Sequence, residues 1–160
     1  MDISNNAKKA RPSSTLSISS NANRMIDEGI DIVNFSAGEP DFNTPDYIKE
    51  AAIEAINDNF TKYTPYEGIV ELRQAVADDL KKNCDLDYTP EQIVISNGSK
   101  HAITNAFMAI LNPEDEVIVP APYWNSYIDI IELCYGVPVV VNTTKQNSFK
   151  VTVEQLEEAV

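Results

Sequence analysis

The sequence predicts an α/β fold: a three-layer α/β/α arrangement with a mostly parallel sheet that is incomplete in this chain. In the second half, apolar strand-like segments lie at residues 92–96, 116–120 and 137–141. Helical segments lie between them at 100–111 and 123–135. Such alternation is typical of parallel strands joined by helices that cover both faces, and near-continuous Val and Ile is typical of buried parallel strands. Three strands are few for a sheet whose edges must all be covered, so we expect part of a larger domain.

The first residues predict a helix, a short strand and a second helix. The helix covers residues 15–28 and ends at Gly29, since glycine is favoured just after a helix. Residues 32–35 (Ile-Val-Asn-Phe) are mostly apolar and predict the strand. Thr44 and Pro45 then form a helix start, because a hydroxyl suits the N-cap and proline loses nothing in the first turn.

Two further helices follow from spacing and capping. Apolar residues recur at helical spacing over residues 69–80. Near the end, Thr152 and Gln155 have the spacing of a capping box, so a helix begins there. The sequence ends inside that helix, which we interpret as a further sign of truncation.

Composition and charge exclude several classes of protein. The net charge is −13, from 12 basic and 25 acidic residues, which argues against binding to nucleic acid or to an anionic membrane. No run approaches the roughly 20 apolar residues of a membrane helix. The first 14 residues are polar, so we expect a cytoplasmic protein. Cys84 and Cys134 are expected as free thiols, and His101 is the only histidine, so no metal site is expected.

Residues 96–100 (Ser-Asn-Gly-Ser-Lys) connect a predicted strand to a predicted helix. Ligands of open α/β sheets bind at such junctions, where the first amides of a helix favour an anion. Gly98 allows close approach of the backbone, Ser99 adds a hydroxyl and Lys100 adds a charge. A phosphate site is one interpretation, and a plain turn at a helix start is the other.

Three more segments carry chemically interesting side chains. Trp124, the only tryptophan, follows a predicted strand and is suited either to stacking on a planar ring or to packing in the core. Residues 36–42 form either a substrate loop or an ordinary turn. The hydroxyl of Tyr63 either donates to a phosphate or covers a helix.

Taken together, these segments resemble the class I aminotransferases, and within them the bacterial and archaeal aspartate aminotransferases. The resemblance runs from about Pro12 to the last residue with matching order and spacing. The four matching segments are SAGEPDFNTP (36–45), KYTPYEGIVELR (62–73), ISNGSKHAITNAF (95–107) and DEVIVPAPYWNSY (115–127).

The resemblance implies a pyridoxal 5'-phosphate enzyme of fold type I that works as a homodimer. Gly98, Ser99 and Lys100 would hold the cofactor phosphate, and Trp124 would stack on the pyridine ring and border the substrate. Tyr63 would reach the phosphate in the neighbouring subunit's site.

Two further positions would contact substrate, which in this family is an amino acid or a 2-oxo acid. Gly38 resembles the glycine whose backbone meets the amino acid, and Thr15 belongs to an arm that closes over it. In domain terms, residues 1–45 would form the N-terminal arm and the start of the small domain. Residues 46–160 would form the first part of the large cofactor-binding domain.

The resemblance also implies what these 160 residues lack. It assigns the Schiff-base lysine, the partners of the pyridine ring and the carboxylate-binding arginine to positions beyond Val160. No catalytic residue is therefore expected here, and these residues alone are expected to be inactive. Tyr66, bulkier than the family pattern, and Ser99, where alanine is also usual, are the departures.

The expected reaction moves an amino group from aspartate to 2-oxoglutarate. Aromatic amino acids, prephenate and alanine stay open as alternatives, because most of the side-chain pocket lies outside this sequence. A non-catalytic cofactor-binding or regulatory protein and a truncated aminotransferase-like product are the competing classes.

Overall fold

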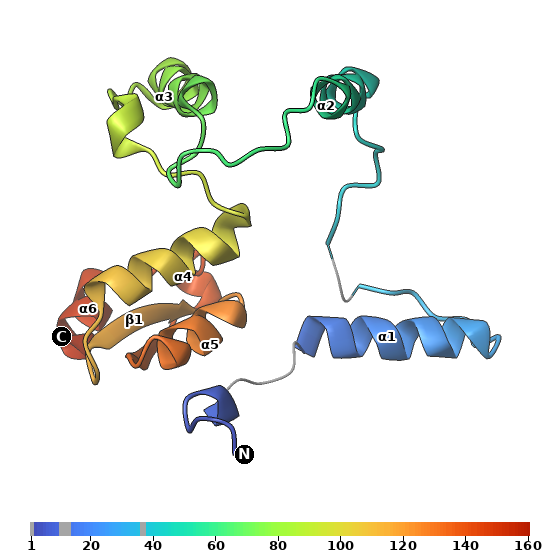
Figure 1. Ribbon diagram of the computed structural model, residues 1–160. Coiled ribbons are helices and arrows are strands. Elements are labelled where there is room, and N and C mark those ends of the chain that lie inside the picture. Colours follow the sequence, from blue (N-terminus) through green and yellow to red (C-terminus); the bar gives the residue numbers. More distant parts are fainter. Residues whose placement is uncertain (1, 10–13, 36–37) are drawn as a thin grey trace. The chain divides into compact units, whose positions relative to one another are not determined.

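The computed structural model describes residues 2–9, 14–35 and 38–160. The chain divides into two compact units, and Figure 1 shows the helices and strands of both. One unit is Gly38–Ser96, and the other combines the described residues before it with Asn97–Val160. The predicted domain boundary between residues 45 and 46 stays a prediction.

A parallel strand pair organises the second unit. Strands β1 (Glu116–Ala121) and β2 (Val137–Asn142) pair in parallel, in a register that runs from Glu116↔Val137 to Ala121↔Asn142. Helix α5 (Ser126–Leu133) connects them. Both strands begin at the residue that the Val and Ile runs predict, and each ends one residue later.

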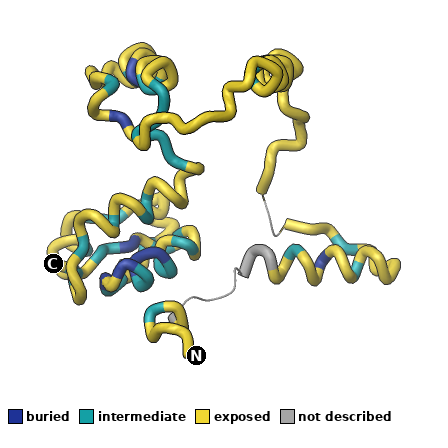
Figure 2. Tube along the Cα trace, in the orientation of Figure 1, coloured by how far each residue is buried: buried dark blue, intermediate teal, exposed yellow. Residues whose placement is uncertain are grey.

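The core of this unit lies between α5 and the two strands. Ile130 and Ile131 on α5 are buried, and so are Val119 of β1 and Val141 of β2 (Figure 2). Cys134, just after α5, completes the cluster. Each fully buried aliphatic side chain stabilises the fold by about 1.5–3 kcal/mol, so this cluster holds the strand–helix–strand unit together.

Two further helices of this unit pack on the strand–helix–strand core. Helix α4 (Gly98–Ile110) packs on α5, and helix α6 (Val153–Ala159) packs on β2. The predicted capping box at the start of α6 is confirmed. The Gln155 N–H donates to Thr152 Oγ1 (3.3 Å), and the Thr152 N–H donates to Gln155 Oε1 (3.2 Å).

Two predicted strands, residues 32–35 and 92–96, are wrong for the chain as the structure describes it. Residues 90–92 instead form a 3₁₀ turn, η2 (Pro90–Gln92), and residues 93–96 are extended without a ladder. The Ile95 N–H donates to Glu67 O (2.8 Å), a loop carbonyl rather than a neighbouring strand. A strand exists only through its hydrogen-bonded neighbour, and an apolar run does not specify one.

Helix α5 is shorter than predicted, and Gly136 is not the left-handed residue that follows it. The helix was expected over residues 123–135 with Gly136 as its cap, but it ends at Leu133 and Tyr135 takes the left-handed conformation (φ +67°). A Cβ on Gly136 would lie 3.0 Å from Leu111 Cδ1 and 3.1 Å from Ile131 Cγ2. Gly136 therefore lies at a close approach, where a side chain would make the neighbouring Leu111 and Ile131 side chains shift.

The remaining helices agree with the apolar spacing. Helix α1 covers Ser14–Asp27 and is followed by Gly29 at φ +78°. The unit 38–96 contains α2 (Asp46–Asn57) and α3 (Val70–Cys84), with α3 packed on η2. In the described ranges, no helix combines the length and the apolar character that crossing a membrane demands.

Candidate functional site

The start of α4 presents an open glycine. Gly98, the first residue of the helix, has φ +80°, and no atom lies within 4 Å of a Cβ built on it. The Asn97 side chain makes no capping bond to the helix, so the first amides of α4 are left without side-chain caps from that position. The amide just before the helix is already bonded within the chain: the Asn97 N–H donates to Nδ1 of His101, a residue of α4 (3.1 Å). Such an uncapped, unobstructed helix start suits a phosphate.

A cation and an aromatic ring meet next to this helix start. Lys100 Nζ lies 5.1 Å from the centroid of the Trp124 ring, a cation–π distance. The indole is in turn fixed by an edge-to-face contact with Tyr127, with centroids 5.5 Å apart and planes at 85°. The Trp124 side chain nevertheless remains 43% exposed. The first turn of α4 and the segment after β1 therefore join at one site.

The ends of the two strands hold this segment in place. The Thr143 N–H donates to Ala121 O (3.1 Å), and the Thr143 hydroxyl donates to the same oxygen. The Ala121–Pro122 peptide is cis, and the Tyr127 N–H donates to Trp124 O (2.9 Å). The carboxyl ends of parallel strands are where α/β sheets bind ligands, and Trp124 is carried by the loop that leaves β1.

Ser99 and Lys100 stand at the second and third positions of α4, where both are exposed. The structure thus brings four predicted residues together, namely Gly98, Ser99, Lys100 and Trp124. The contact between Lys100 and Trp124 was not predicted, because residues 24 positions apart carry no spacing signal.

Gly38 and Tyr63 belong to the other unit, where both are exposed. Tyr63 has a fully exposed side chain, and Gly38 has no atom within 4 Å of a built Cβ. The backbone of Thr15 lies in the first turn of α1. The side chain of Thr15, together with Pro12, Ser36 and Ala37, lies outside the described residues.

An additional basic side chain, missed by the sequence analysis, ties the Tyr63 segment to its surroundings. Arg73 of α3 donates from Nε to Gly68 O (3.1 Å) and from Nη1 to Pro90 O (2.8 Å). Its charge and helical position gave no sign of this, because exposed arginines are common on helices.

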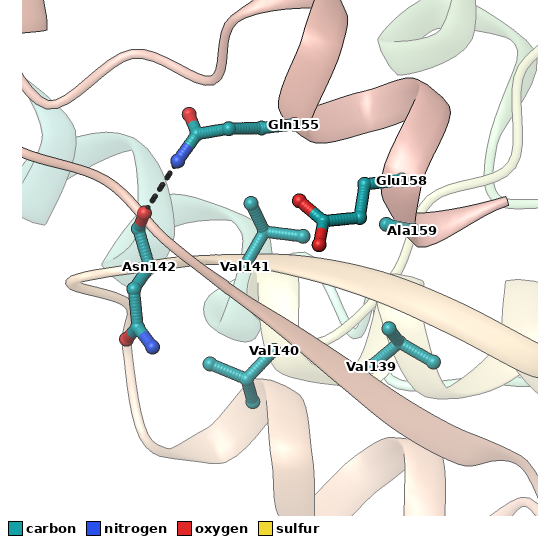
Figure 3. A pocket seen from close by; sticks show the side chains of 7 residues that line it. All are labelled: Val139, Val140, Val141, Asn142, Gln155, Glu158 and Ala159. Atoms are coloured by element: carbon teal, nitrogen blue, oxygen red, sulfur yellow. Dashed lines mark hydrogen bonds between the residues drawn. The ribbon is translucent and has the colours of Figure 1, made fainter.

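A cavity of about 370 Å³ lies elsewhere, between β2 and α6 (Figure 3). It is lined by Val139, Val140, Val141, Asn142, Gln155, Glu158 and Ala159. The Gln155 amide spans it and donates from Nε2 to Asn142 O (2.7 Å). None of the predicted site residues borders it, and its strand side consists of three valines and Asn142.

Titratable groups give the site no metal-binding character. Within residues 2–9, 14–35 and 38–160, no three His, Cys, Asp or Glu side chains gather as ligands. Cys84 and Cys134 are free thiols, as predicted, and burial raises the pKa of the Cys134 thiol. The helix start at Gly98 is suited to binding an anion, and the exposed Trp124 ring is suited to stacking on a flat ring.

The family model and the curated relatives that match this chain point to the same family, the aminotransferases. The model "Aminotransferase class I and II" matches residues 30–160. A probable aspartate/prephenate aminotransferase of Rhizobium leguminosarum bv. phaseoli is 47% identical over 152 residues, covering 95% of this chain and 38% of that protein. An aspartate aminotransferase of Bacillus subtilis is 41% identical over 160 residues, covering all of this chain and 41% of its own length.

Solved structures agree with these relatives. An aspartate aminotransferase of Thermus thermophilus with maleate superposes with a TM-score of 0.94 at 39% identity, covering 100% of this chain and 42% of its own. An aspartate aminotransferase of Rhizobium meliloti gives a TM-score of 0.92 at 38% identity, with 100% and 40% coverage. The chain thus spans about 40% of the length of the relatives it matches.

Proposed function

This chain belongs to the class I and II aminotransferase family, and from that premise we propose that the whole protein is a pyridoxal-phosphate-dependent transaminase. Its reaction would move the amino group of an amino acid, aspartate above all, to a 2-oxo acid such as 2-oxoglutarate. The observation that carries the proposal is the junction of the open Gly98 helix start with the Lys100–Trp124 pair. A phosphate and a planar ring in one molecule match these two features.

The residues at the start of α4 fit the phosphate of the cofactor. Gly98 leaves room in front of the first amides, which donate to an anion along the positive end of the helix. The Ser99 hydroxyl adds a donor, and the Lys100 ammonium adds a positive charge. In a protein with a net charge of −13, such local donors are needed to hold an anion.

Trp124 fits the ring of the cofactor. Its indole is held edge-on by Tyr127 and is still 43% exposed, so it offers a surface for stacking. Pyridoxal phosphate, when bound, supplies an electron sink for the Cα of an amino acid. The contribution of these residues is to orient the ring and to hold the phosphate.

Two residues of the other unit complete the proposal. Gly38 would present its backbone to the amino acid. Tyr63 would donate its hydroxyl to the phosphate in the neighbouring subunit of a homodimer, and its full exposure within one chain supports a partner of that kind. Thr15, in the first turn of α1, would belong to the arm that closes over substrate.

Aspartate is favoured as the amino donor by the names of the relatives. The Thermus thermophilus structure with maleate adds a four-carbon dicarboxylate to that argument. The test measures the glutamate that the whole protein forms from 2-oxoglutarate with aspartate as the donor, because glutamate is the product that all amino donors share. Alanine and phenylalanine as donors serve as controls, and turnover with neither aspartate nor these donors would overturn the proposal.

Prephenate is a second candidate substrate, because several relatives at 45–48% identity are named probable aspartate/prephenate aminotransferases. Prephenate would accept the amino group in place of 2-oxoglutarate. The discriminating measurement is the ratio of kcat/KM for the two acceptors with aspartate as the common donor.

The proposal also covers residues 1–160 by themselves. None of their lysines is assigned to the Schiff base, and Lys100 is assigned to the phosphate, so these residues alone would not transaminate. Borohydride treatment with pyridoxal phosphate, followed by peptide mapping, tests this. A reduced, cofactor-modified lysine at one position of this chain, together with turnover, would contradict it.

A further inference from the structure

The segment that carries Tyr63 ends in a clamped turn. Residues 63–68, here called the Tyr63 loop, close with a turn in which the Gly68 N–H donates to Pro65 O (3.0 Å). Tyr63 at the start of the loop is fully exposed, while Glu67 and Gly68 at its end are half-buried. The loop therefore has an exposed end at Tyr63 and a packed end at Gly68.

Arg73 fastens the packed end to two other segments at once. From α3, its Nε donates to Gly68 O (3.1 Å) and its Nη1 donates to Pro90 O (2.8 Å). One half-buried side chain thereby joins the loop, α3 and η2. Lysine could not replace it, because one ammonium on a flexible stem lacks the rigid fork that reaches two separate carbonyls.

Residues 93–95 hold the same turn from another direction. The Ile95 N–H donates to Glu67 O (2.8 Å). A Cβ on Gly68, which has φ +101°, would lie 2.5 Å from Ile95 Cγ1. The turn is therefore packed against Ile95 with no space for a side chain, so its position is set by contacts on both sides.

The charge of Arg73 acts on two carboxylates, Glu67 and Glu91. The pKa of Glu67 is lowered by a hydrogen bond from its own backbone N–H, by the Tyr66 hydroxyl and by the Arg73 charge. The pKa of Glu91 is lowered by the Thr89 hydroxyl, by its own backbone N–H and again by Arg73. The Arg73 charge is the smallest of these causes for both carboxylates, which lie on the two segments whose carbonyls Arg73 bonds.

We propose that Arg73 is the positioning residue for Tyr63: by fixing Gly68 it sets the place from which the tyrosine hydroxyl reaches a phosphate. The inference rests on the proposed function, since it needs Tyr63 to contact the cofactor. Holding the loop in its binding geometry before the cofactor arrives lowers the entropy lost on binding. Arg73 itself touches no cofactor or substrate.

The test is a double-mutant cycle in the whole protein, with the dissociation constant of pyridoxal phosphate as the readout. Tyr63→Phe removes one hydrogen bond to a charged group and should weaken cofactor binding about tenfold. Arg73→Lys should weaken it about fivefold, and the double variant should bind as Tyr63→Phe does, within about twofold. With the cofactor saturating, kcat of Arg73→Lys should stay within about twofold of the parent.

Controls separate the two ways in which the idea fails. Arg24→Lys is the matched variant, since Arg24 is exposed and donates to Asn21 in α1 and to Glu28 just after it; its affinity should equal that of the parent. Tyr63→Phe with unchanged affinity would overturn the role of Tyr63, and the role of Arg73 with it. Tyr63→Phe with weakened affinity but multiplicative effects in the double variant would overturn the role of Arg73 alone.

Unfolding in urea checks that the variants are folded at the assay temperature. Arg73→Gln, which keeps one amide donor, replaces the lysine variant if that one is unfolded. The double variant of Arg73→Gln and Tyr63→Phe should also bind pyridoxal phosphate as Tyr63→Phe does. Multiplicative effects of the two substitutions on the dissociation constant would contradict the proposal in the same way.

Discussion

Replacing Gly98 by alanine tests the open helix start directly, because Gly29 supplies a matched control. The two glycines have almost the same positive φ, +80° and +78°, and neither has an atom within 4 Å of a built Cβ. Alanine at either position pays the same penalty for a left-handed Cβ, about 1–2 kcal/mol. Gly29→Ala and Gly98→Ala should therefore reduce the free energy of unfolding by similar amounts.

Cofactor binding should separate the two variants. At Gly98 the added methyl enters the space in front of the first amides of α4, whereas Gly29 follows α1. Loss of one hydrogen bond to a charged phosphate costs about 1.5–3 kcal/mol. Since about 1.4 kcal/mol corresponds to a factor of ten, Gly98→Ala should raise the dissociation constant of pyridoxal phosphate roughly 10- to 100-fold.

The assay is an absorbance titration of the apo form of the whole protein with pyridoxal phosphate, together with urea unfolding of each variant. Gly29→Ala should bind like the parent once its stability loss is accounted for. An unchanged affinity in Gly98→Ala, or an equal loss in both variants, would refute the assignment of this helix start to the phosphate.

Four other changes have definite expected outcomes. Trp124→Ala should weaken cofactor binding about tenfold and Trp124→Phe less, since an aromatic pair contributes about 0.5–1.5 kcal/mol; the same titration measures both. Ile131→Ala, at the most buried position (1% exposed), should lower the free energy of unfolding by about 2–5 kcal/mol in urea. Iodoacetamide followed by peptide mapping should label exposed Cys84 well before buried Cys134, whose thiol pKa is raised by burial. The pKa of Glu154 is lowered by its own backbone N–H and then by the Thr152 hydroxyl. Its stabilising contribution is therefore present above the ordinary carboxyl pKa and lost as pH falls through the lowered value. The free energies of unfolding of Glu154→Gln and the parent, measured in urea, should accordingly converge as pH falls below the ordinary carboxyl pKa.

Local signals in the sequence were sufficient for the capped and turn-bounded elements. Thr152 and Gln155 predict the start of α6 because a capping box involves only neighbouring residues. The helix expected over residues 100–111 is present as α4, but it begins two residues earlier, at Gly98. The parallel pairing of β1 and β2 followed from two Val-rich runs of similar length separated by one helix.

Features that depend on distant residues were not predictable. Residues 92–96 have the composition of a strand, but their neighbour in a sheet is not encoded in that segment. Gly136 was interpreted as a helix cap, whereas Tyr135 takes the left-handed conformation and Gly136 lies close to Leu111 and Ile131. The Arg73 clamp and the Lys100–Trp124 contact also join positions with no fixed sequence spacing.

The strand–helix–strand segment of β1, α5 and β2 has a consequence for the order in which the protein folds. Its strands pair at an offset of 21 positions, from Glu116↔Val137 onward, and its buried side chains come from the same short stretch. Loop closure over so few residues has a small entropic cost, and local contacts form fast. During synthesis this segment is therefore complete as soon as Asn142 leaves the ribosome, and pulsed hydrogen exchange should protect the β2 amides before those of α2, which has no buried side chain.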